Sequence, residues 1–115
     1  MSEKLLQLNF KFNVSAADYE GAVAPLAKDF AAVPGLRWKI WLMNEDQHEA
    51  GGLYMFEDAR SLNAYLEGPL AQGVKSHPAL SEFSAKTFDI MDDLTAVTRG
   101  PVRVTATAER VRAPS

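Results

Sequence analysis

The fold is decided by residues 34–58, PGLRWKIWLMNEDQHEAGGLYMFED. Two apolar and aromatic runs, 36–43 and 52–56, flank a polar, charged connection. Side chains of these types suit a pleated, half-buried surface, so the stretch predicts two strands of an antiparallel hairpin. The connection is too long and too charged for a two-residue turn. Trp38 and Trp41 are predicted to point to opposite faces of the sheet, one into a core and the other towards a partner or a cavity.

The composition narrows the class of protein. A chain of 115 residues fits one domain. Twelve Lys and Arg residues against fifteen Asp and Glu residues give a net charge of −3, which argues against a nucleic-acid footprint. Cysteine is absent, which excludes disulfides, thiolate metal sites and cysteine nucleophiles. The N-terminus has no signal-peptide pattern and no apolar run approaches the roughly 20 residues of a membrane span, so a cytoplasmic protein is expected.

The N-terminal third predicts a strand followed by a helix. Residues 4–12 alternate between an apolar face and a mostly polar face, which is typical of a strand. Ser15 and Asp18 resemble a capping box at the start of a helix. An apolar stripe at spacings of three and four then predicts an amphipathic helix: Tyr19, Val23, Leu26, Phe30 and Val33. Pro25 lies inside this stripe and should kink or open the helix, before the pair at 34–35 ends it.

The second half predicts another helix and a last strand. Asp58 can cap a helix whose apolar face carries Leu62, Tyr65 and Leu66. The Gly-Pro pair at 68–69 should end its first segment, with a second short helical piece to follow. Residues 83–91 predict a fourth strand. The order of elements predicts an α+β fold, the ferredoxin-like plait (βαββαβ), with a four-stranded antiparallel sheet and two helices on one face.

The face of the sheet that the helices leave uncovered is expected to contact a partner. Alternation along the strands assigns to it a mixture of polar and apolar side chains: Gln7, Asn9, Lys11, Arg37, Lys39, Trp41 and Met43. Pairing with a second copy would bury this mixture, so a homodimer is predicted. Residues 1–98 are expected to form a single domain. For the C-terminal tail, residues 99–115, two interpretations stay open: an added edge strand or a frayed end.

Several motifs resemble a known family. The central ones are WKIW at 38–41, Asn-Glu at 44–45 and EAGGLYMF at 49–56. Their order and spacing are similar to those of the YdhR-like family of monooxygenases. The opening LLQLNFKF at 5–12 and AKTFDI at 85–90 also resemble that family's first and last strands.

The resemblance spans roughly residues 5–94 and implies a dimeric α/β-barrel. That superfamily includes small cofactor-independent oxygenases of antibiotic biosynthesis, so the resemblance implies oxygenase chemistry by analogy. Two features depart from the family pattern. The pair at 68–69 interrupts the second helix, which runs on in the family, and the tail after about Thr98 has no counterpart there.

The implied activity is a monooxygenase that uses no cofactor and binds a small phenol- or hydroquinone-like aromatic substrate in an aromatic-lined pocket. Six residues are the substrate-binding candidates: Asn9, Trp38, Lys39, Trp41, Tyr54 and Tyr65. Rings can stack on a flat substrate, tyrosine hydroxyls can donate hydrogen bonds, and a lysine can stabilise an anion. Each of these residues also suits an ordinary place in the core, an interface or an ion pair. No individual catalytic residue is assigned, and no metal site is expected, because the chain carries no known catalytic or metal-binding motif.

Two alternatives stay open beside this hypothesis. The first is a non-catalytic dimer that binds a small ligand or serves as an interaction module. The second is haem-linked oxygenase chemistry. His77 follows the second helix, near where haem-degrading members of the superfamily carry an axial histidine, and Asn9 lies on the first strand. Those enzymes also use a tryptophan, and here no tryptophan falls in the second helix, so that match is partial.

Overall fold

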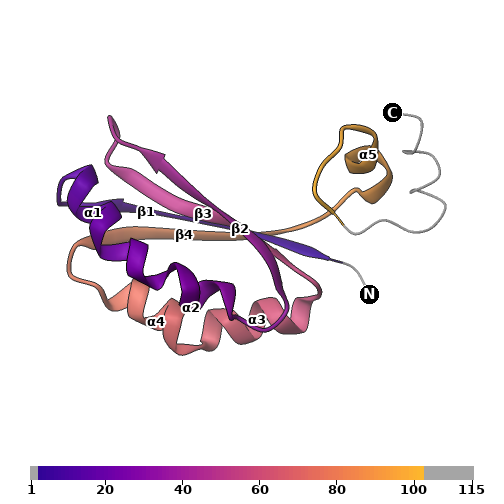
Figure 1. Cartoon of the computed structure of the whole chain (residues 1–115), viewed down its shortest axis with the longest axis horizontal. Coiled ribbons are helices and arrows are strands. Elements are labelled where there is room, and N and C mark those ends of the chain that lie inside the picture. Colours follow the sequence, from indigo (N-terminus) through magenta and orange to yellow (C-terminus); the bar gives the residue numbers. More distant parts are fainter. Residues whose placement is uncertain (1–2, 103–115) are drawn as a thin grey trace.

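The sheet has the strand order of a ferredoxin-like plait. The computed structural model describes residues 3–102 (Figure 1). Its strands are β1 (Lys4–Phe12), β2 (Leu36–Asn44), β3 (Glu49–Phe56) and β4 (Leu80–Asp89). They form one four-stranded antiparallel sheet in the order β2-β3-β1-β4. The predicted fold class is therefore confirmed.

The helices form two arms over one face of the sheet (Figure 1). The first arm consists of α1 (Ala16–Val23), a 3-10 turn η1 (Ala24–Leu26) and α2 (Ala27–Ala31). The second arm consists of α3 (Ala59–Glu67) and α4 (Pro69–Ser76). The other face of the sheet is not covered by either arm (Figure 1). The space between the arms and the sheet is thus separate from the open face.

Local sequence signals explain where the arms begin and break. The Ser15 hydroxyl accepts a hydrogen bond from the backbone N–H of Asp18 at 3.0 Å, and the Asp58 carboxylate accepts one from Ser61 at 2.8 Å. Both predicted caps are confirmed. Pro25 lies within the 3-10 turn, as expected for a residue without a backbone donor. Gly68 has an extended backbone that ends α3, and Pro69 begins α4.

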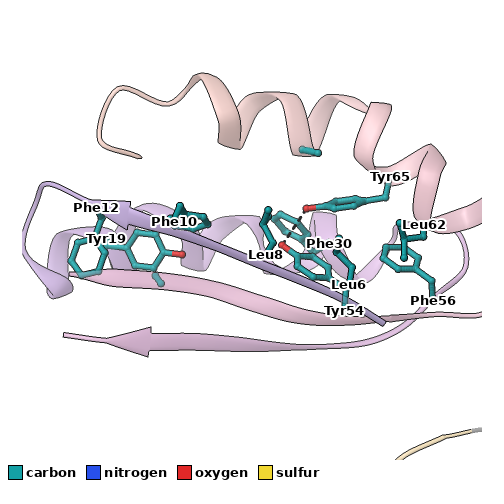
Figure 2. Close-up of a cluster of buried hydrophobic side chains, with 12 residues drawn as sticks. Leu6, Leu8, Phe10, Phe12, Tyr19, Phe30, Tyr54, Phe56, Leu62 and Tyr65 are labelled. Carbon is teal, nitrogen blue, oxygen red and sulfur yellow. Dashed lines mark hydrogen bonds between the residues drawn. The ribbon is translucent and has the colours of Figure 1, made fainter. Parts of the chain in front are cut away.

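The core lies between the sheet and the arms (Figure 2). Its centre is the apolar face of β1, where alternate residues are buried as predicted: Leu6, Leu8, Phe10 and Phe12. Tyr19 and Phe30 reach it from the first arm, and Leu62 and Tyr65 reach it from the second. Aromatic rings thus meet in the middle of the helix-covered side.

A bulge in β2 overturns the predicted assignment of faces on that strand. The register with β3 shifts between Leu36 and Trp38, so Arg37 is an extra residue. Leu36 pairs with Phe56, and three residues later Lys39 pairs with Tyr54, so both point towards the helices. The sequence prediction assumed strict alternation along this strand, and it therefore placed Lys39, Trp41 and Met43 on the open face. That prediction was wrong. Trp38 and Ile40 lie on the open face instead.

The C-terminal region contains a helix that the sequence did not predict. β4 spans Leu80–Asp89 rather than 83–91, and α5 (Asp92–Val97) follows it beyond the end of the sheet (Figure 1). Two aspartates in the first turn of α5 favour a helix start there. The choice between an edge strand and a frayed end for the tail falls on residues 103–115, which lie outside the described residues. Within residues 3–102 no helix is long and apolar enough to cross a membrane.

Candidate functional site

Lys39 is enclosed by aromatic rings on the helix-covered side of the sheet. Its Nζ atom lies 3.4 Å from a ring centre of Trp41, 3.6 Å from that of Phe30 and 4.6 Å from that of Tyr54. All three distances are within the roughly 6 Å over which a ring face attracts a cation. Among residues 3–102, no carboxylate forms a salt bridge with this amine. We call Lys39 and these three rings the lysine box.

Gly52 makes room for the lysine side chain. It pairs with Trp41 across the two strands and lies two residues before Tyr54. A Cβ atom at this position would lie 2.9 Å from Cε of Lys39 and 3.2 Å from a ring carbon of Tyr54. Any larger residue would push the lysine out of its place between the rings.

Burial changes the acid–base behaviour of Lys39. Because rings and aliphatic side chains replace the water around it, the pKa of Lys39 falls to about 7. The ring faces act in the opposite sense, since they favour the ammonium form. Both protonation states are therefore populated near neutral pH. The neutral amine can accept a proton, and the ammonium form can stabilise an anion.

Two tyrosine hydroxyls meet beside the lysine box (Figure 2). The Tyr65 hydroxyl, from α3, donates a hydrogen bond to the Tyr54 hydroxyl at 3.2 Å. Burial raises the pKa of both phenols above their usual value, and for Tyr54 the nearby Tyr65 adds to the effect. Both hydroxyls therefore stay protonated at neutral pH and act as hydrogen-bond donors rather than as bases.

A small cavity adjoins the lysine box. Its volume is about 20 Å³, and its walls include Lys39, Trp41 and Tyr54. A space of that size holds about one water molecule. No carboxylate and no imidazole is among its lining residues. The amine of Lys39 is thus the titratable cation of this cavity.

Two larger hollows flank the small cavity. The helical cleft, of about 340 Å³, lies between the first arm and α4 and shares five apolar or aromatic residues with the cavity: Tyr19, Val23, Leu26, Val74 and Leu80. The edge hollow, of about 410 Å³, lies between α1 and β2 and shares Tyr19, Val23 and Trp41 with it. A third hollow, of about 450 Å³, lies between α2 and the second arm and does not include Lys39. The helical cleft and the cavity beside Lys39 therefore share part of their walls.

The structure divides the six predicted site residues into two groups. Lys39, Trp41, Tyr54 and Tyr65 come together around Phe30 on the helix-covered side. Asn9 and Trp38 belong to the open face. The Asn9 side chain accepts a hydrogen bond from Gln7 at 3.0 Å.

Trp38 has a structural partner of its own. Its indole N–H donates a hydrogen bond to the backbone carbonyl of Pro101 at 2.7 Å. This contact ties the segment after α5 to β2. The prediction that the two tryptophans face opposite sides of the sheet is confirmed, because Trp41 packs edge-on against Phe30 of α2 at 5.3 Å between ring centres.

Two residues of the site were not among the candidates. Phe30 contacts Lys39, and Tyr19 lines all the spaces that adjoin the lysine box. Burial raises the pKa of Tyr19 to about 12, so it too remains a protonated phenol. The sequence signal for both was the apolar stripe of the first helix, which predicts burial but not contact with a particular lysine.

The residues present fit a haem group poorly. His77 lines the helical cleft, but its Nδ1 atom accepts a hydrogen bond from the backbone N–H of Ala79 at 3.1 Å. That bond places the ring proton on Nε2, whereas an axial ligand binds iron through an unprotonated nitrogen. Within residues 3–102, no group of three or more His, Cys, Asp or Glu side chains could hold a metal ion.

Solved structures share this fold at low sequence identity. SnoaB, a cofactor-independent oxygenase from Streptomyces nogalater, has a TM-score of 0.62 at 19% identity, over 92% of this chain and 98% of that one. Protein SO0527 from Shewanella oneidensis has a TM-score of 0.65 at 13% identity, over 77% and 91%. The heme-degrader MhuD from Mycobacterium tuberculosis has a TM-score of 0.59 at 16% identity, over 76% and 95%. The search of curated proteins finds no match.

A family profile identifies the chain more directly. The profile described as "Putative mono-oxygenase ydhR" matches residues 5–101. That range contains all of the sheet except Lys4, both helical arms and the lysine box. It also extends past residue 94, where the resemblance in the sequence motifs ended, and includes α5. The chain belongs to the ydhR mono-oxygenase family.

Proposed function

We propose that this protein is a cofactor-independent monooxygenase of a small phenol- or hydroquinone-like substrate. The observation that carries the proposal is the lysine box: a partly buried amine that titrates near neutral pH, held by three rings at a small cavity that shares its walls with an apolar cleft. Such a site can remove a proton from a weakly acidic substrate and then stabilise the anion. Membership of a mono-oxygenase family supports the same conclusion.

The proposed reaction uses electrons from the substrate alone. The neutral amine of Lys39 takes a proton from the hydroxyl or the activated C–H group, and the resulting anion reduces oxygen. One oxygen atom forms a C–O bond to the ring, and the other leaves as water with the two hydrogens that the substrate loses. An anthrone plus O₂ thus gives an anthraquinone plus H₂O, with the new oxygen as a carbonyl, and a hydroquinone plus O₂ gives a hydroxyquinone plus H₂O. Lys39 in its ammonium form and the Tyr54–Tyr65 hydroxyl pair stabilise the developing negative charge.

The substrate is proposed to lie in the helical cleft, with its reactive ring next to the lysine box. The cleft has about 340 Å³, which is within the roughly 300–1,000 Å³ of small-molecule pockets. The cavity of about 20 Å³ is too small for a ring, so Val23 and Leu26 of the first arm must move aside. The 3-10 turn at Pro25 interrupts helical hydrogen bonding next to these residues and makes such movement easier.

Oxygen consumption tests this function. Wild-type protein should consume oxygen with dihydroxynaphthalene or anthrone-type compounds, and Lys39→Met should lose roughly 100-fold in rate, the usual contribution of a proton-transfer group. Lys28→Met, at an exposed site on α2, is the matched control and should keep the full rate. Absence of oxygen uptake across a broad panel of phenols would rule the proposal out.

A second test separates the two groups of candidate residues. Trp41→Phe and Tyr54→Phe change the lysine box and should lower the rate. Trp38→Phe and Asn9→Ser change the open face, which we assign to contact with a second copy rather than to substrate. Equal losses from both pairs of variants would contradict this assignment.

We also propose that the protein is a homodimer that pairs through the open face. Ile40 and Phe88 on that face are 46% and 43% exposed, which is unusual for large apolar side chains on a sheet. α5 and its N-terminal flank expose three more apolar residues: Met91, Leu94 and Val97. Light scattering after size exclusion should give twice the chain mass of 12.6 kDa. A stable monomer would refute the dimer without touching the proposed chemistry.

A non-catalytic binding protein is the second candidate function. It is favoured by one observation, the absence of any carboxylate or imidazole from the cavity beside Lys39. In that case a phenol would raise the melting temperature without oxygen uptake, because a ligand that binds only the native state stabilises it. A panel of phenols, quinones and polycyclic aromatics measured for both quantities distinguishes the two functions.

A further inference from the structure

The lysine box has the features of a site for amine chemistry as well as for proton transfer. A lysine attacks a carbonyl group only as the neutral amine, and it must be free of a carboxylate that would hold its proton. Lys39 is partly buried among three rings, and no carboxylate of the described residues forms a salt bridge with it. The other lysines differ: Lys4 pairs with Asp89, and Lys11 donates a hydrogen bond to the backbone carbonyl of Gln47. The remaining three are exposed: Lys28, Lys75 and Lys86.

The surroundings of Lys39 also suit a covalent adduct. The helical cleft shares five wall residues with the small cavity that Lys39 lines. The cleft is lined mainly by apolar side chains, with Asp18 and His77 as its titratable polar members apart from Tyr19. An apolar site excludes the water that would hydrolyse an imine. Burial keeps the Tyr54 hydroxyl protonated by raising its pKa, and Tyr54 is the residue directly opposite Lys39 in the strand pair. A protonated phenol on the facing residue suits a step that releases hydroxide from a carbinolamine.

We propose that the ε-amine of Lys39 condenses with the carbonyl group of an apolar aromatic aldehyde or ketone to form an imine. The amine nitrogen bonds to the carbonyl carbon to give a carbinolamine, and the C–O bond then breaks. The carbonyl oxygen leaves as water together with both hydrogens of the neutral amine. No oxidant or reductant is consumed. The step goes beyond the proposed monooxygenase, since it makes a covalent bond between this lysine and a ligand.

Reductive trapping tests the proposal on the intact wild-type protein. 2-Naphthaldehyde is added at pH 7 with sodium cyanoborohydride, which reduces an imine to a stable secondary amine. Intact mass should show one naphthylmethyl group, and peptide mapping should place it on Lys39. At pH 7 a lysine with the ordinary pKa of about 10.4 is neutral in less than ~0.1% of molecules. Restricted entry of the aldehyde will slow the reaction at Lys39. Even so, Lys39 should be labelled at least ~10-fold faster than Lys28 or Lys75.

Variants and pH provide the controls. Lys39→Arg keeps the positive charge but cannot form the imine, and it should lose the label. Lys28→Arg should keep it. The rate of labelling at Lys39 should reach half its maximum near pH 7, whereas labelling at exposed lysines should keep rising above pH 9. Circular dichroism of the Lys39→Arg protein distinguishes loss of the amine from loss of the fold.

Two results would overturn the proposal. One is a label spread over the exposed lysines with none on Lys39. The other is label on Lys39 with the same rate and pH profile as Lys28. Neither result bears on oxygen uptake by phenols, which needs no aldehyde, so failure here and failure of the monooxygenase proposal are separate outcomes.

Discussion

Lys39 on β2 and Tyr54 on β3 are directly paired across the hairpin, and the lysine amine lies 4.6 Å from the centre of the tyrosine ring. Both residues point into the side of the sheet that the helices cover. The pair brings a titratable cation next to a protonated phenol, whose oxygen accepts a hydrogen bond from Tyr65. The chemistry proposed for this protein depends on that placement.

The free energy of unfolding should rise between about pH 7 and pH 10. Lys39 has a lowered pKa of about 7 in the folded protein, while in the unfolded chain it binds its proton up to about pH 10.4. The unfolded state therefore holds more protons in this window, and the slope should approach, but not exceed, about 1.4 kcal/mol per pH unit. Urea denaturation of the wild type and of Lys39→Met measures it. A wild-type slope that persists in the variant would assign the effect to other groups.

Above about pH 10 the trend should reverse. The pKa of Tyr19 is raised to about 12 and that of Tyr54 is also raised, so these phenols stay protonated in the folded state after they ionise in the unfolded state. The folded state then holds more protons, and stability falls as pH increases. The Tyr54→Phe variant should lose less stability than the wild type between pH 10 and pH 12. An identical loss in both proteins would show that Tyr54 does not contribute.

The Tyr54–Tyr65 hydrogen bond should show coupling in a double-mutant cycle. Tyr65→Phe leaves the buried Tyr54 hydroxyl without its donor, which should cost about 1–3 kcal/mol. Replacing both residues with phenylalanine should cost less than the sum of the two single changes, because no unsatisfied hydroxyl remains. Chemical denaturation of the four proteins provides the cycle. Strictly additive losses would mean that the bond contributes nothing to stability.

Two glycines should respond in opposite ways to alanine. A Cβ atom at Gly51 would lie 1.9 Å from the backbone oxygen of Leu8 on the neighbouring strand, so Gly51→Ala should cost roughly 3 kcal/mol. Gly73 lies within α4 with no atom within 4 Å of an added Cβ, and Gly73→Ala should stabilise the protein by about 1 kcal/mol. Thermal and urea denaturation of both variants measures the contrast. Tolerance of alanine at Gly51 would contradict the close approach of β1 and β3.

The Trp38 indole should hold the segment after α5 in place. Trp38→Phe removes the hydrogen bond to the carbonyl of Pro101, and cleavage by trypsin after Arg99 should then become faster. Trp41→Phe, which alters the other face of the same strand, is the control and should leave the cleavage rate unchanged. Limited proteolysis followed by mass spectrometry gives both rates. Equal acceleration in the two variants would indicate general loosening of the sheet rather than release of this segment.

The sequence by itself determined the order of elements, the caps and the core face of β1. Those features depend on local signals: alternation over residues 4–12, side-chain acceptors at Ser15 and Asp58, and breaks at Pro25 and at 68–69. α5 escaped prediction because it is only six residues long and has no side-chain cap. Trp41, Tyr54 and Tyr65 could be named from the sequence as site candidates, since large rings are favoured both in cores and in pockets.

Only the tertiary structure decided which candidates share a site. The extra residue at Arg37 shifts the register of β2, and because side chains alternate with a period of two, one extra residue exchanges the faces of every residue after it. That shift moved Lys39 and Trp41 to the helix-covered side and left Trp38 on the open face. A bulge depends on how two strands fit against each other rather than on the residues of one strand. For this reason the lysine box, with Phe30 contributed by a distant helix, was not visible in the sequence alone.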